Sequence, residues 1–253
     1  MFIPGVFASA AVIVQAGIVL STLFWAKKKN KGDMRPVVIG GVTFYVFALL
    51  LENVVHYILL IGIPDWESRV SASLFLYVLY GCSMAALFEE SGRYYSFTRV
   101  LTSYKEPRAA LGYGVGHGGL EMVLSGMLGL LLLRPESFTA MDSSLWVFER
   151  ATALAGHSAL SMIVFYGVQA GKKRYALLAV ALHGIADIPI GLYKYGAVSL
   201  ILCDALFAAA VLLCAGVAVW CYRQLHATKG FIDNRKGHHG NDPSKSRIFS
   251  KQN

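Results

Sequence analysis

Long apolar runs, separated by short polar segments, recur along nearly the whole chain. A helix needs about 20 residues to cross a hydrocarbon core of about 30 Å, and seven runs reach or approach this length. They lie at residues 4–26, 37–63, 70–89, 109–133, 147–170, 175–191 and 197–221. The sixth run is short and ends near Pro189. The pattern predicts an all-α fold, a polytopic membrane helix bundle of about seven transmembrane helices that occupies residues 1–225.

Basic residues lie in alternate loops between these runs. They gather at 27–35, 93–108 and 172–174 and in the segment after Tyr222. The loops near Asp65, 136–142 and 191–196 contain few of them. Because short cytoplasmic loops are enriched in Lys and Arg, we expect the N-terminus outside the plasma membrane and the C-terminus in the cytoplasm. Residues 226–253 are polar and basic, which predicts a disordered cytoplasmic tail.

The composition agrees with a membrane bundle. The 253 residues are 56% hydrophobic and only 15% charged, whereas soluble domains contain about 25% charged residues. The basic loops account for the net charge of +8, so we expect membrane lipids as partners and no nucleic acid. The four cysteines form no CxxC pair and all lie in apolar runs, which predicts packing residues rather than disulfides or metal ligands.

Ionisable residues inside the apolar runs are the candidate functional groups, because such residues are costly in lipid and usually functional. His117 and Glu121 lie four residues apart and share a helix face, as do His183 and Asp187. Counted from the basic side, both histidines lie about 12–13 Å deep and both carboxylates about 18–19 Å deep. His157 falls near the middle of the fifth run. These depths favour one shared site over separate hydrogen bonds that only hold helices together.

Two further polar pairs lie toward the outer side of the bundle. Glu52 and His56 are four residues apart in the second run, and they belong either to the site or to an outer polar network. Glu149 and Arg150 lie near the outer end of the fifth run and can satisfy each other's charge or pair with Glu52, which favours a structural role.

A cluster of charged residues, Glu89, Glu90 and Arg93, ends the third run on the basic side. Glu89 can activate a water molecule if a hydrated cavity reaches it. It lies about 28 Å along its run, so helix tilt or a vestibule facing the cytoplasm is needed to bring it to His117. Without either, Glu121 is the better base.

These donors suit two kinds of hydrolysis. Zinc binds His nitrogen and carboxylate oxygen and leaves one position for water, which makes His117, Glu121, His157 and His183 the expected ligands. In a metal-free scheme, a glutamate activates water while histidines stabilise the oxyanion. The spacing differs from the HExxH of soluble zinc peptidases, and the residues alone leave both schemes open.

The motifs follow one another in a distinctive order: Glu89–Arg93 (EESGR), Tyr113–Glu121, Glu149 through His157, and His183–Asp187. This order resembles the CPBP superfamily, which includes the CAAX prenyl endopeptidases and the PrsW-like proteases. Within it the chain is most similar, over residues 36–190, to the YhfC family of predicted membrane peptidases.

The resemblance implies a role for each matched residue. Glu89 would activate water with support from Glu90 and Arg93, His117 and His183 would bind or stabilise the oxyanion, and Asp187 would orient the site. Glu121 and His157 are additional to the metal-free scheme of that superfamily and suit a metal site.

We therefore expect an intramembrane endopeptidase that uses zinc-activated or glutamate-activated water. Its substrate would be a peptide or a membrane protein, cut in the cytoplasmic half of the bilayer. Two alternatives stay open. Buried histidines and carboxylates also carry protons in transporters, and a non-catalytic membrane binding or immunity protein could keep the same residues.

Overall fold

The structure, a computed structural model, describes residues 5–133 and 138–240, with side chains described for 5–132 and 138–227. Every regular element in these ranges is helical. In chain order they are α1 (Gly5–Lys29), α2 (Arg35–Phe44), η1 (Tyr45–Leu51), α3 (Glu52–Gly62), α4 (Trp66–Ser71), α5 (Leu74–Tyr95), η2 (Ser96–Val100), α6 (Pro107–Glu121), η3 (Met122–Leu128), α7 (Gly129–Leu133), α8 (Ala140–Gln169), α9 (Arg174–Lys194) and α10 (Leu200–Gly240). The segments labelled η are π-helical.

Six helical stretches in the described part of the chain are long and apolar enough to cross a membrane. They are Gly5–Lys29, Arg35–Gly62, Pro107–Leu132, Ala140–Gln169, Arg174–Lys194 and Leu200–Ala227. These stretches coincide with six of the seven predicted runs and confirm the polytopic all-α bundle. The remaining run, 70–89, falls largely on α5, whose charged residues reduce its hydropathy. A seventh span and the orientation of the termini stay predictions.

Two boundaries differ from those expected. Helix α9 continues through Pro189 to Lys194, so the proline does not end this span, and its 21 residues are sufficient to cross a bilayer. Helix α10 continues to Gly240, so residues 226–240 of the segment expected to be disordered are helical. Residues 241–253 lie outside the described residues.

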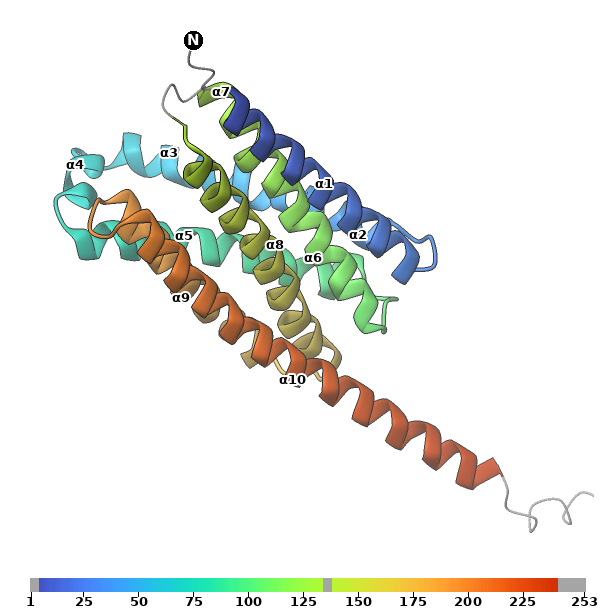
Figure 1. Cartoon of the computed structure of the whole chain (residues 1–253). Coiled ribbons are helices and arrows are strands. Elements are labelled where there is room, and N and C mark those ends of the chain that lie inside the picture. The colour runs from blue at the N-terminus through green and yellow to red at the C-terminus, as the bar shows by residue number, and fades with distance from the viewer. Residues whose placement is uncertain (1–4, 134–137, 241–253) are drawn as a thin grey trace, which may run out of the picture.

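Helices α6 and α8 form the centre of the bundle (Figure 1). Helix α2 packs on α6, α10 packs on α8, and α9 contacts both α5 and α10. Glycines permit the closest of these approaches. A Cβ atom on Gly116 would lie 1.8 Å from the carbonyl oxygen of Val37 in α2, and one on Gly114 would lie 2.5 Å from the Cα of Ser158 in α8. The glycines beside His117 therefore set the spacing of three helices.

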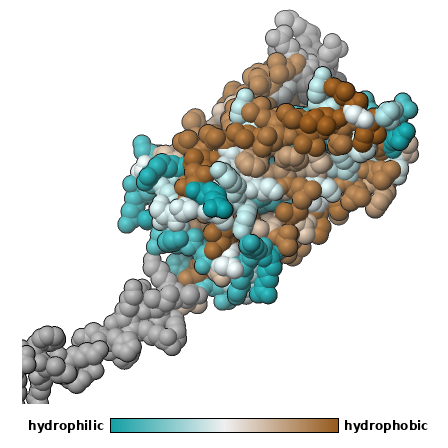
Figure 2. All heavy atoms as spheres, turned by 180° about the vertical axis from the view of Figure 1, so that it is seen from behind, coloured by the Kyte–Doolittle hydropathy of each residue, from teal (hydrophilic) through white to brown (hydrophobic). Residues whose placement is uncertain are grey.

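The surface has the distribution expected of a membrane protein. Hydrophobic residues cover much of the face in Figure 2, and hydrophilic residues gather mainly toward the end from which the C-terminal segment leaves. Large apolar side chains such as Ile13, Phe24, Leu132 and Leu212 are at least 70% exposed. Exposure of so many large apolar groups is compatible with lipid as the surrounding medium.

Candidate active site

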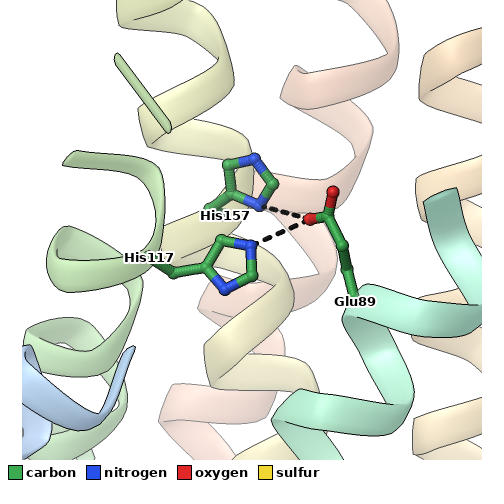
Figure 3. A group of neighbouring side chains, drawn as sticks. All are labelled: Glu89, His117 and His157. Atoms are coloured by element: carbon green, nitrogen blue, oxygen red, sulfur yellow. Dashed lines mark hydrogen bonds and ion pairs between the residues drawn. The ribbon is translucent and has the colours of Figure 1, made fainter. Parts of the chain in front are cut away.

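The carboxylate of Glu89 lies at the centre of the polar site. Its Oε2 atom is 2.8 Å from Nε2 of His117, 3.7 Å from Nδ1 of His157 and 3.9 Å from Nε2 of His183. The four residues come from α5, α6, α8 and α9, so four helices direct polar groups to one place. Figure 3 shows three of them, Glu89, His117 and His157. All four are buried, with His117 completely inaccessible.

Two of the histidines have a carboxylate on the ring nitrogen that faces away from Glu89. Nε2 of His157 lies 2.5 Å from Oε2 of Glu121, and Nδ1 of His183 lies 2.8 Å from Oε1 of Glu90. A carboxylate in this position fixes the tautomer and the ring orientation of a metal-binding histidine. His117 has no such partner, because its Nδ1 is buried without a hydrogen bond among the described residues.

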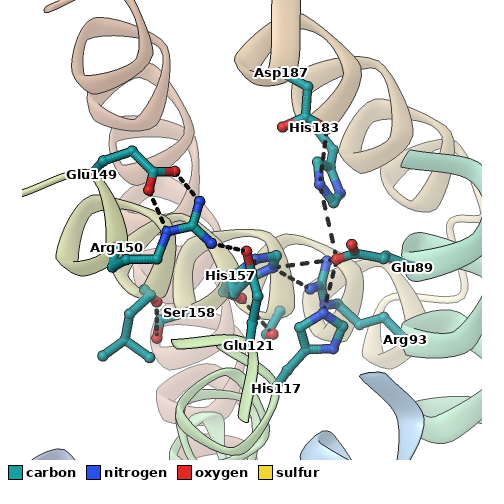
Figure 4. Close-up of polar contacts among 12 residues, drawn as sticks. Glu89, Arg93, His117, Glu121, Glu149, Arg150, His157, Ser158, His183 and Asp187 are labelled. Atoms are coloured by element: carbon teal, nitrogen blue, oxygen red, sulfur yellow. Dashed lines mark hydrogen bonds and ion pairs between the residues drawn. The ribbon is translucent and has the colours of Figure 1, made fainter. Parts of the chain in front are cut away.

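Two arginines lie beside the carboxylates behind the histidines. Figure 4 shows one of them, Arg150, between Glu121 and Glu149. Arg93 donates to Glu90 and contacts Nδ1 of His157 at 3.2 Å. Arg150 donates to Glu121 at 3.0 Å and also pairs with its neighbour Glu149. Each of these two carboxylates thus has an opposite charge beside it, which lowers the cost of its burial in an apolar medium.

A second polar group lies between the site and the α3–α4 end of the bundle. Nε2 of His56 lies 3.2 Å from Glu52, and its Nδ1 contacts the hydroxyl of Tyr80. The ring of Tyr80 in turn packs edge-on against Trp66. These residues join α3, α4 and α5 and form one wall of a cavity.

The cavity has a volume of about 870 Å³, within the range of about 300–1,000 Å³ typical of ligand pockets. Its inner wall includes Glu89, Glu121, His157, His183 and Asp187. Oδ2 of Asp187 lies 3.5 Å from Nε2 of His183. The polar groups of the site therefore line an open cavity.

The most compact set of donors fits a metal ion. Nδ1 of His157, Nε2 of His117 and a carboxylate oxygen of Glu89 all lie within 4.8 Å of one another. Two histidines and one glutamate are a donor set that catalytic zinc sites use, with the fourth position left for water. The guanidinium of Arg93 now contacts Nδ1 of His157, and a bound ion would replace that contact.

The structure brings the predicted residues together, with some changes of partner. The helical depth count would have kept Glu89 and His117 apart, but α5 runs obliquely to α6 (Figure 1) and the two side chains meet. Among the expected ligands, Glu121 lies behind His157 rather than beside the compact donor set, and Glu89 takes its place. His183 lies at the edge of that set.

The other predicted residues either touch the residues of the site or line the cavity farther out. Glu90, Arg93 and Asp187 touch its histidines. Glu149 and Arg150 pair as expected, and Arg150 also reaches Glu121. Glu52 and His56 pair with each other and line the same cavity farther out.

Sequence reasoning missed two buried polar residues, Gln15 in α1 and Asp204 in α10. Asp204 is 2% exposed, and neither of its carboxylate oxygens has a hydrogen-bond partner among the described residues. Asp204 lies inside the seventh apolar run, so the cost of a charge in lipid is a sequence signal that identifies it. Neither residue lines the cavity.

Comparison with known proteins gives one family. The model of the YhfC intramembrane metalloprotease family matches residues 11–135 and 131–208, which is more than half of the chain. The chain is also 28% identical to the uncharacterized membrane protein YhfC of Bacillus subtilis (strain 168), over 70% of this chain and 80% of the relative. No solved structure matches the chain.

Proposed function

Because the chain belongs to the YhfC intramembrane metalloprotease family, we propose that it is a zinc-dependent endopeptidase of the plasma membrane. Its substrate is a peptide or a membrane protein, and the basic loops and the C-terminus face the cytoplasm. One observation carries the proposal: three imidazole nitrogens from three helices surround a single buried glutamate oxygen beside a large cavity.

In this proposal His117, His157 and Glu89 hold the metal ion. Zinc bound there supplies Lewis acidity, which polarises a peptide carbonyl and makes water a stronger acid. The carboxylate of Glu121 lies 2.5 Å from Nε2 of His157, so it holds the proton on Nε2 and leaves Nδ1 free for the ion. Arg150 keeps Glu121 in place.

The remaining groups stabilise developing charge and transfer protons. His183 acts as an imidazolium: its Nδ1–H donates to Glu90 and its Nε2–H points toward the centre of the site. There it donates a hydrogen bond to the oxygen that becomes negative as water adds to the peptide carbonyl. Asp187 lies beside the same nitrogen and lines the cavity. It accepts a proton from the attacking water and delivers it to the leaving amine, so the peptide bond breaks with no net change of protons.

The metal-free scheme gives Glu89 a different role. There the glutamate is the base, whereas here it is a ligand. The substitution Glu89→Gln separates the two roles, because loss of a ligand lowers the zinc content whereas loss of a base leaves any bound zinc in place. We expect Glu89→Gln to lower zinc affinity and activity together.

The activity can be tested before any substrate is identified. Membranes of cells that contain the wild-type protein, His117→Ala or His226→Ala are compared by mass spectrometry of protein N-termini. His226 is exposed on α10, far from the cavity lining, and serves as the matched histidine control. We expect new internal N-termini with the wild type and His226→Ala and none with His117→Ala. Equal sets in all three membranes would exclude the protein as their source.

A further inference from the structure

The cavity leads from the histidines to one end of the bundle only. At its inner end lie Glu89, His157 and His183, and at its outer end lie Trp66, Glu67, Val70 and Ser71 of α4 and Lys194 at the end of α9. Glu67, Ser71 and Lys194 are exposed. Within the described residues, no lining residue belongs to the basic loops at 27–35, 93–108 or 172–174.

A hydrophobic core fills the bundle between the site and the basic loops. It includes Phe97, Tyr113, Ile163 and Phe165, each no more than 1% exposed, and extends to Tyr175 and Cys221. The ring of Phe97 contacts the rings of Tyr113 and Phe165 at centroid distances of 4.9 and 5.3 Å. This packing leaves no room for the cytoplasm-facing vestibule that the sequence suggested.

The loops at this closed end are also tied together. The hydroxyl of Tyr104 donates to Asp33 at 2.6 Å, and the side chain of Gln169 donates to the carbonyl of Tyr104 at 3.3 Å. The hydrogen bonds from Arg35 and Tyr104 hold the pKa of Asp33 well below its usual value, so its carboxylate stays charged and accepts both bonds at neutral pH.

The distribution of charge assigns the two ends to the two sides of the membrane. The closed end carries the basic loops, and such loops stay in the cytoplasm. The α3–α4 connection lies at the opposite end from the α1–α2 connection (Figure 1). Residues 63–71, which comprise this connection and α4, contain one basic residue, Arg69, beside Asp65 and Glu67. The open end therefore faces the outside.

From this arrangement, and resting on the proposed peptidase function, we propose that the site receives its substrate from the non-cytoplasmic side. The substrate is a peptide, or the outer juxtamembrane segment of a membrane protein, that enters between α3, α4 and the end of α9. Cleavage then releases a product on the outer side, in contrast to the cytoplasmic cut expected from the sequence.

The chemistry of the outer part of the cavity agrees with a polypeptide ligand. Tyr57, Trp66 and Tyr80 supply aromatic walls for apolar side chains, while Glu52 and Glu67 supply negative charge. Aromatic side chains bury large areas at low entropic cost. A segment with apolar residues and a basic residue beside the scissile bond fits this lining.

Labelling with a membrane-impermeant maleimide tests the direction of access independently of activity. The buried native thiols that line the cavity, Cys82 and Cys214, are first replaced with alanine. Ser71→Cys then places a thiol at the outer end of the cavity, and Ser103→Cys places one in an exposed position of a basic loop. We expect intact cells to label Ser71→Cys, and to label Ser103→Cys only after permeabilisation. The reverse pattern would overturn the proposal.

The same variants test whether the open end is the route of the substrate. A bulky maleimide adduct on Ser71→Cys should reduce the new membrane N-termini at least tenfold, whereas the same adduct on Ser103→Cys should leave them unchanged. Unaltered cleavage with the Ser71→Cys adduct would refute the route while the peptidase function stands. If the unmodified variants and the wild type produce no new N-termini, the peptidase function itself fails, and the labelling still decides which side the cavity faces.

Discussion

The contact between α2 and α6 gives a quantitative test of the packing that positions His117. In Gly116→Ala, the new Cβ would lie 1.8 Å from the carbonyl oxygen of Val37 and 2.6 Å from its carbonyl carbon. Both are backbone atoms, so no side chain can rotate away to relieve the contact. Raising the shortest distance to 3.0 Å requires the helices to separate by about 1.2 Å.

A shift of this size has two consequences. Overpacking of a close-packed interior costs about 1–3 kcal/mol, which corresponds to a melting temperature lower by about 2–12 °C for a domain of this size. Because His117 is the next residue, its Nε2 also moves relative to Glu89. We therefore expect weaker zinc binding together with lower stability.

Gly119→Ala is the matched control, because a Cβ on Gly119 meets nothing within 4 Å. Alanine is also the better helix former, so this variant should be as stable as the wild type or more stable by up to about 1 kcal/mol. Thermal unfolding of both purified variants in the same detergent measures the difference. Equal melting temperatures for Gly116→Ala and Gly119→Ala would show that α2 and α6 do not meet as described.

Two substitutions test the charged groups behind the histidines. Glu121→Gln removes the carboxylate from Nε2 of His157 and should weaken zinc binding by about 10–100-fold; competition with a chromophoric chelator measures this, and an unchanged affinity would remove Glu121 from the metal site. Arg93→Met removes the arginine from the buried carboxylate of Glu90 and should cost about 3–5 kcal/mol of stability. If Arg93→Met unfolds at the same denaturant concentration as the wild type, the result contradicts a buried ion pair between Arg93 and Glu90.

The sequence predicted the helical class and most of the site because these features depend on local composition. Apolar runs gave six spans confirmed by length and hydropathy, and the cost of charge in lipid identified the residues that surround the cavity. The four-residue spacing of His117 and Glu121 also correctly placed both on one helix, α6.

The pairing of those residues depends on tertiary structure and could not be read from spacing. Two residues four apart share a helix face, but His117 contacts Glu89 of α5 and Glu121 contacts His157 of α8. The depth count could not decide whether helix tilt brings Glu89 to His117, because the angle between two helices depends on how their surfaces pack. The open end of the cavity was equally hidden, since it depends on how rings such as Phe97 pack between helices that are distant in sequence.

The zinc content of the purified protein tests the metal centre most directly. We predict about one zinc ion per chain for the wild type and for the control His226→Ala. We predict almost none for His117→Ala and His157→Ala when the three variants are as well folded as the wild type. Zinc retained by His117→Ala and His157→Ala, or a wild-type protein that cleaves its substrate without any metal, would contradict the account.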